Sequence, residues 1–170
     1  HSGMLYVGDW SKDRVAVVDP RSGAISKSIP TGRSPAHLVM SEDGSRLFVA
    51  NREADSISVI DTRKQDVIKE IGVGHAPFAL TLTPDQTKLI VANAQSATLS
   101  IIDTSSLAVV ASSETRKMPY GLAVTKNGSQ LLVANQANGS VSVFDASTRQ
   151  LRAEIKVGRY PEGLAAIQDG

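Results

Sequence analysis

Basic residues recur at one fixed spacing in the sequence. Arg33, His75, Lys117 and Arg159 each stand two residues before a proline, 42 residues apart, and Arg116 precedes Lys117. If the fold brings these positions together, their charges converge on one site. Such a site favours an anionic ligand: phosphate, a carboxylate, an acidic peptide or, with weaker support, single-stranded nucleic acid.

Three aromatic residues could complete this anion site. Trp10, Phe78 and Tyr120 are expected on the same face, where aromatic rings stack on ligands or anchor protein partners. Trp10 could equally cover the seam at which the fold closes. The alternative for the basic positions is a solvated loop that tolerates charge, because acidic residues stand nearby and cancel much of the field: Asp9, Asp13, Glu53, Asp55 and Glu162.

Common catalytic and cofactor motifs are absent from the sequence. It contains no G-x-S-x-G, no H-E-x-x-H, no P-loop and no Asp-rich calcium loop. The stretch "GVGHAP" begins like a dinucleotide fingerprint, but it lacks the third glycine and opens no helix. With no cysteine and three histidines, a histidine-rich metal site is not expected within one chain. The sequence therefore predicts no cofactor, no metal site and no catalytic residue.

The histidines leave an enzymatic alternative open. His37 stands where the other repeats have Ala79, Gly121 and Gly163. We interpret it as a residue that fills the axis of the fold, with ligand binding or proton transfer as the alternative. As a second hypothesis, His37 or His75 serves as the base of a lyase or hydrolase at the axis mouth.

The elements that must position these residues form four copies of one unit. "LYVGD", "LFVAN", "LIVAN" and "LLVAN" begin at residues 5, 47, 89 and 131. In the second copy, the β-rich runs "LFVAN", "SISVID", "DVIKEI" and "FALTLT" follow one another between turn residues, with no room for a long helix. Four strands in a repeat of this length predict an all-β fold, the β-propeller, with one four-stranded blade for each repeat.

The side chains also predict the order of the strands in a blade. Small residues at the position of Ala79 suit an innermost strand, where blades crowd around the axis. Lys69 and Glu70 suit an outer edge strand that must not pair with other chains. The predicted order from the axis outward is "FALTLT", "LFVAN", "SISVID", "DVIKEI".

Composition limits the protein class. The chain has 170 residues, 41% of them apolar and 21% charged, a formal charge of +1, and no apolar run long enough for a membrane span. We divide it into a single propeller domain, 4–170, with repeats 4–46, 47–88, 89–130 and 131–170. Residues 1–3 resemble the remainder of a cleaved expression tag. The possibility that an export signal was removed from the natural protein therefore stays open.

The pattern "LxVAN…SVSVxD…IxVGxxPxGLAV", quoted from residues 131–165 together with 121–124, resembles the YVTN family of propeller repeats. The resemblance covers residues 4–168. It implies a β-propeller that binds or supports other molecules, and a periplasmic or extracellular location. Known members have about seven blades, whereas this sequence has four repeats.

The repeats allow more than one way to close the ring. Residues 162–167, "EGLAAI", match an innermost strand and could pair with "LYVGD". Within one chain this gives a four-bladed ring. Between two chains it gives an eight-bladed homodimer, which we prefer because blades built for a wide ring need less distortion. A third possibility is a piece of a longer propeller.

From the sequence we expect a non-catalytic scaffold that presents one face to a protein or an anionic ligand. The basis is a nearly perfect structural repeat without an assembled acid, base or nucleophile. The enzymatic alternative stays open because other propellers do catalysis at the channel mouth.

Overall fold

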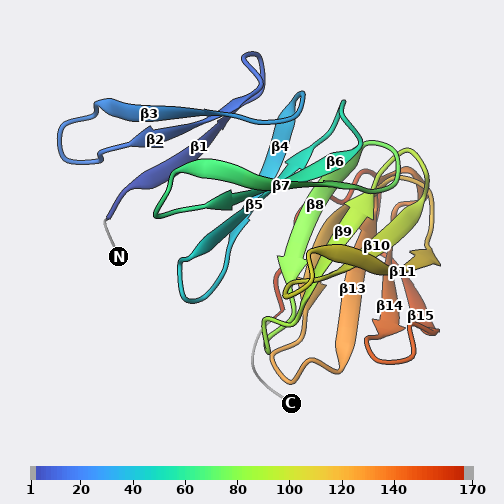
Figure 1. Ribbon diagram of the computed structural model, residues 1–170. Coiled ribbons are helices and arrows are strands. Elements are labelled where there is room, and N and C mark those ends of the chain that lie inside the picture. The colour runs from blue at the N-terminus through green and yellow to red at the C-terminus, as the bar shows by residue number, and fades with distance from the viewer. Residues whose placement is uncertain (1–2, 167–170) are drawn as a thin grey trace.

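The computed structural model describes residues 3–166, which form four antiparallel β-sheets and one 3-10 turn at Gln136–Asn138. The sheets follow one another along a curved row, in chain order (Figure 1). His1 and Ser2, two of the three residues interpreted as a tag remainder, lie outside the described residues.

Each sheet is a meander of consecutive strands. The first contains β1 (Leu5–Asp9), β2 (Arg14–Val18) and β3 (Ile25–Pro30). The second contains β4 (Pro35–Met40), β5 (Arg46–Asn51), β6 (Ser56–Asp61) and β7 (Asp66–Gly72). The third contains β8 (Pro77–Leu82), β9 (Lys88–Asn93), β10 (Thr98–Asp103) and β11 (Ala108–Glu114). The fourth contains β12 (Pro119–Val124), β13 (Gln130–Asn135), β14 (Ser140–Asp145) and β15 (Leu151–Lys156).

The strand order of the sheets agrees with the sequence prediction. In the second sheet β4 and β7 are the two edges, and β8 of the third sheet packs between β4 and β12. The strands β4, β8 and β12 are therefore innermost. The charged residues Lys69 and Glu70 lie exposed on the outer strand β7.

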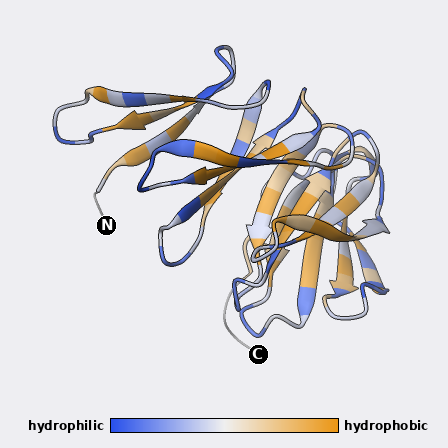
Figure 2. Cartoon of the chain, in the orientation of Figure 1, coloured by the Kyte–Doolittle hydropathy of each residue, from blue (hydrophilic) through white to orange (hydrophobic). Residues whose placement is uncertain are grey.

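Three apolar clusters hold the sheets together, one at each sheet-to-sheet interface. Phe48 and Ile57 of the second sheet pack with Leu89 and Ile102 of the third. Because the middle strands of the second and third sheets have a neighbouring sheet on each side, both of their faces are buried, and even Ser58 is inaccessible to solvent. Figure 2 shows the apolar residues along the strands and the polar residues in the connecting loops.

The aspartate that ends the third strand of each full blade caps the following turn, and so does its equivalent Asp19, directly after β2. Oδ1 of Asp61 accepts the N–H groups of Arg63 and Lys64 at 2.9 and 3.0 Å. The equivalent aspartates accept turn N–H groups in the same way: Asp19, Asp103 and Asp145. These aspartates recur every 42 residues because each repeat has the same turn at this place.

The closed four-bladed ring is not formed in this structure. Among residues 3–166 the first sheet has three strands, and β1 pairs with β2 alone. Residues 162–166, the described part of the segment expected as an innermost strand, form no strand, and Ile167 lies outside the described residues. The physical reason is geometric: the sheets curve too little over four repeats to bring this segment to β1 (Figure 1).

No helix within residues 3–166 is long and apolar enough to cross a membrane.

Candidate active site

The inner strands line a pocket on the axis side of the sheets. It has a volume of about 370 Å³ and is lined by β4, β8, β12 and the segment after β15. Its side chains with functional groups are His37, Tyr120 and Glu162, and Phe78 adds an aromatic wall. A pocket of this size suits a small-molecule ligand.

His37 is held in one orientation on β4. Its Nδ1 accepts the backbone N–H of Leu80 on β8 at 3.1 Å, so the neutral ring carries its proton on Nε2. Desolvation keeps the pKa of His37 below its usual value. The ring therefore ties two inner strands together and presents an N–H donor at the pocket, which makes it a binding group more readily than a base.

Phe78 and Tyr120 form one aromatic surface. Their ring centroids lie 3.8 Å apart, with 26° between the ring planes. The two residues occupy the same position of successive repeats, on β8 and β12. Both are half-buried, so the stack keeps an exposed face beside the pocket.

His75 and Asp55 form a paired acid and base at the loop end of these strands. Nδ1 of His75 lies 2.7 Å from Oδ2 of Asp55. The other oxygen, Oδ1, accepts the N–H of Ala76 at 2.8 Å. That backbone hydrogen bond is the main reason that the pKa of Asp55 is lowered, and the bond to His75 adds to it. An ionised Asp55 keeps Nδ1 protonated and leaves Nε2 of an exposed imidazole free to accept a proton.

Arg33 lies close to this pair. Its Nη2 donates to the carbonyl of Glu53 at 2.7 Å, and its charge contributes to the lowered pKa of Asp55. The guanidinium has further donors for an anionic group. The structure thus brings together Arg33, Asp55 and His75 from three loops at one end of the sheets.

Of the remaining basic residues, Arg116 has an acidic partner outside this group. Arg116 forms a salt bridge at 3.0 Å with Glu154 on the outer strand β15. Lys117 and Arg159 are exposed on the loops before Pro119 and Pro161. Trp10, in the β1–β2 loop, is 43% exposed, and the guanidinium carbon of Arg52 lies 5.9 Å from its ring centroid.

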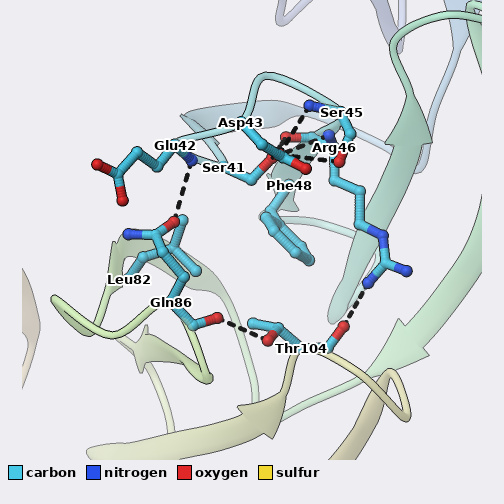
Figure 3. A pocket seen from close by; sticks show the side chains of 9 residues that line it. All are labelled: Ser41, Glu42, Asp43, Ser45, Arg46, Phe48, Leu82, Gln86 and Thr104. Atoms are coloured by element: carbon cyan, nitrogen blue, oxygen red, sulfur yellow. Dashed lines mark hydrogen bonds between the residues drawn. The ribbon is translucent and has the colours of Figure 1, made fainter.

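A second pocket opens at the opposite end of the strands, between the second and third sheets. It has a volume of about 540 Å³, and Phe48 forms one of its walls (Figure 3). Its polar groups are used to join the sheets: the N–H of Glu42 donates to Gln86 at 3.1 Å, and Arg46 donates to the carbonyl of Thr104. Residues 3–166 contain no cluster of three acidic or histidine side chains that could hold a metal ion.

Two residues of the candidate site have a different role from the one the sequence indicated. Asp55 and Glu162 were counted only as acids that cancel a basic field. The sequence did hold one sign that Asp55 is special, because an aspartate stands at this position in only two of the four repeats. The equivalent positions hold Asp13, Ala97 and Gly139. The pairing of Asp55 with His75 cannot be read from spacing, since it depends on how two loops meet.

Sheets with this strand order, packed around a row of inner strands, define a β-propeller fold. A family model named "Lactonase, 7-bladed beta-propeller" matches residues 14–106, more than half of the chain. The chain belongs to this family of propellers. Comparison with curated proteins gives no match.

Solved structures share the fold. The hydrazine synthase of Kuenenia stuttgartiensis aligns with a TM-score of 0.86 and 26% identity over 92% of this chain and 46% of that one. A putative 6-phosphogluconolactonase from Bacteroides fragilis aligns with a TM-score of 0.80 and 21% identity, over 92% and 52%. The dihydro-heme d1 dehydrogenase NirN aligns with a TM-score of 0.77 and 18% identity, over 93% and 36%. This chain thus spans about half, or less, of these relatives.

These relationships correct the functional expectation. The expectation of a non-catalytic scaffold is wrong, because the family to which the chain belongs is named for an enzyme. A near-perfect repeat was a poor guide, since a catalytic pair can occupy one copy of a repeated loop. The YVTN assignment stays a prediction, as do the location and the partners, and the family has seven blades where this chain has four repeats.

Proposed function

We propose that this chain carries the catalytic face of a propeller hydrolase that opens lactones. The observation that carries the proposal is the 2.7 Å pair of His75 and Asp55, with an exposed imidazole, in a chain of the lactonase family. Its loop leads directly into β8, whose Phe78 lines the axis pocket.

The proposed reaction is hydrolysis of a cyclic ester. Nε2 of His75 takes a proton from water as the water oxygen attacks the lactone carbonyl. The ring C–O bond then breaks, and the leaving oxygen receives that proton, which gives a hydroxy acid. Asp55 stabilises the imidazolium that forms in between.

The other residues would bind the substrate. Arg33 offers donors for the developing oxyanion or for an acidic group on the substrate. Tyr120 and Phe78 offer an apolar surface for the face of a sugar ring, as in other carbohydrate sites with aromatic walls. The N–H of His37 supplies a directional donor on β4.

Ring closure is the second part of the proposal. The exposed strand β1 shows Leu5 and Val7 at 51% and 48% exposure. Residues 161–166 repeat the sequence of an innermost strand and could add to β1 of a second copy, giving an eight-bladed homodimer. Two observations support this proposal. Within residues 3–166 the first sheet lacks an innermost strand, and residues 161–166 have the sequence of such a strand.

The test is lactone hydrolysis by the whole chain at constant pH, with glucono-δ-lactone, 6-phosphogluconolactone and δ-valerolactone as substrates. We expect turnover above the spontaneous rate, reduced about 100-fold or more by His75→Gln and by Asp55→Asn. Gln95→Ala, an exposed loop variant, serves as the control and should leave the rate unchanged. If no lactone is hydrolysed faster than in buffer, or if His75→Gln retains the full rate, the assignment is wrong.

Light scattering over a dilution series tests closure separately. A mass near twice 18.0 kDa at all concentrations supports the homodimer, and a single-chain mass contradicts it.

A further inference from the structure

The interface between the third and fourth sheets contains a pocket that the proposed hydrolase does not use. Its volume is about 340 Å³. Its walls are mainly apolar and come from both sheets: Ile90, Leu99, Ile101 and Val110 from the third, Leu131 and Phe144 from the fourth. Lys88 and Arg149 stand among its polar lining residues.

The repeats show why this interface is not filled. In the first and second sheets, Ile29 and Ile71 of the outer strands pair with Val15 and Ile57 and are 1% and 5% exposed. Both belong to the apolar clusters. The equivalent residue of the third sheet is Ser113, which lines the pocket. Replacing a buried isoleucine by serine removes three carbon atoms from the interface and leaves space in its place.

A second difference between the repeats places a positively charged side chain beside the space at Ser113. Leu107 packs against the apolar cluster between the second and third sheets. Its equivalent one repeat later is Arg149, in the turn between β14 and β15. No ion pair or hydrogen bond of the Arg149 guanidinium occurs within residues 3–166. Lys88, in contrast, is paired with Asp103 at 2.9 Å.

We propose that this pocket binds a small carboxylate with an apolar body, such as a medium-chain fatty acid. The apolar walls accept the chain, since an apolar cavity that water does not fill takes up hydrocarbon. The unpaired guanidinium of Arg149 accepts the carboxylate through two parallel hydrogen bonds. Both features distinguish this interface from the one between the second and third sheets. There, Ile71 and Leu107 pack against the apolar core, and polar bonds join the loops around the pocket of Figure 3.

Calorimetric titration of the whole chain with octanoate tests the proposal. We expect saturable binding with a Kd at or below about 1 mM. Ser113→Ile restores the repeat residue and should weaken octanoate binding at least 10-fold while raising the melting temperature by about 2–4 °C. Arg21→Leu, an exposed turn variant of the first sheet, is the control and should bind as the original chain does.

A second pair of measurements tests the role of Arg149 and the position of the ligand. Arg149→Leu, which copies Leu107, should weaken octanoate at least 10-fold and leave 1-octanol binding within 2-fold. A crystal soaked with 8-bromooctanoate should show the bromine between Leu99 and Phe144. The proposal is overturned by an absence of saturable octanoate binding, by equal loss of octanoate and octanol in Arg149→Leu, or by bromine located elsewhere. If Ser113→Ile does not fold, the bromine position and Arg149→Leu decide the matter.

Discussion

Nδ1 of His75 lies 2.7 Å from Oδ2 of Asp55, and this pair occurs once among the repeats of residues 3–166. At the equivalent place in the preceding repeat, Asp13 accepts the N–H of Ser34 at 2.9 Å, but the basic residue there is Arg33, whose guanidinium donates to a carbonyl instead. The capping aspartate therefore has a structural role in the two repeats that carry it, at Asp13 and Asp55. In the second copy, His75 adds an imidazole that pairs with this aspartate.

The cap provided by Asp55 makes stability depend on pH. Its folded-state pKa is lowered, so its contribution is fully present above the unfolded value of about 3.9 and is lost as the pH falls through the lower folded value. We expect Asp55→Asn to lower the urea midpoint at pH 7. The difference from the original chain should shrink as the pH falls below about 4.

Urea unfolding between pH 3 and pH 7 measures this dependence. Glu42→Gln removes an exposed carboxylate from a loop at the opposite end of the strands and should follow the original chain throughout. A midpoint difference for Asp55→Asn that is constant over the whole range would contradict a role for the ionised carboxylate.

The buried asparagines at the ends of the second strands give a second prediction. Asn51 is inaccessible to solvent, and its Nδ2 donates to Ser58 and Ser56 at 2.7 and 3.1 Å. Asn51→Ala leaves the buried Ser58 with one partner fewer and opens a small cavity. The expected cost is about 1–3 kcal/mol of the free energy of unfolding.

Equilibrium urea unfolding checks this cost, and Gln95→Ala, on an exposed loop, should change stability by less than about 0.5 kcal/mol. Asn93 makes the equivalent bond to Ser100 at 2.9 Å, so Asn93→Ala should cost a similar amount. A near-zero effect in both variants would show that these amides are dispensable.

The sequence was sufficient for the strands of the four sheets and their order, but not for residues 162–166, which were expected in a strand and form none. A blade is a local meander, so alternation, turn residues and the charges of Lys69 and Glu70 contain the information needed. In the structure, Nδ2 of Asn51 donates across to Ser58 on β6. The recurrence of this asparagine in three repeats does not reveal its partner, because Ser58 becomes buried only when a second sheet covers it.

Ring closure and the pairing of His75 with Asp55 could not be predicted from the sequence, for a physical reason. The number of blades depends on small rotations between neighbouring sheets, which add up over the ring. No residue pattern within a single repeat reveals the size of these rotations. Asp55 and His75 are 20 residues apart and meet only because the β5–β6 and β7–β8 loops lie side by side. Residue types at fixed spacing predicted a ring of cations with Arg116 beside it. Spacing did not show that Arg116 pairs with Glu154 on the outer strand β15.

The inner strands provide the last prediction, at Gly121 on β12. A Cβ atom at this position would lie 2.0 Å from the backbone carbonyl oxygen of Glu162, far inside the contact distance. At the equivalent Gly163 a Cβ would meet no atom within 4 Å. Gly121→Ala should therefore displace residues 161–166, at a cost of about 1–3 kcal/mol in the free energy of unfolding, while Gly163→Ala serves as the matched control.

Urea unfolding of the two variants measures the cost, and lactone turnover measures its consequence. Because Glu162 lines the axis pocket beside Tyr120, its displacement in Gly121→Ala should raise KM more than it lowers kcat, since His75 and Asp55 stay in place. Equal stability of Gly121→Ala and Gly163→Ala would mean that the segment after β15 does not pack on β12. The pocket would then lack its wall at Glu162, and the substrate would be held by β4, β8 and β12 alone.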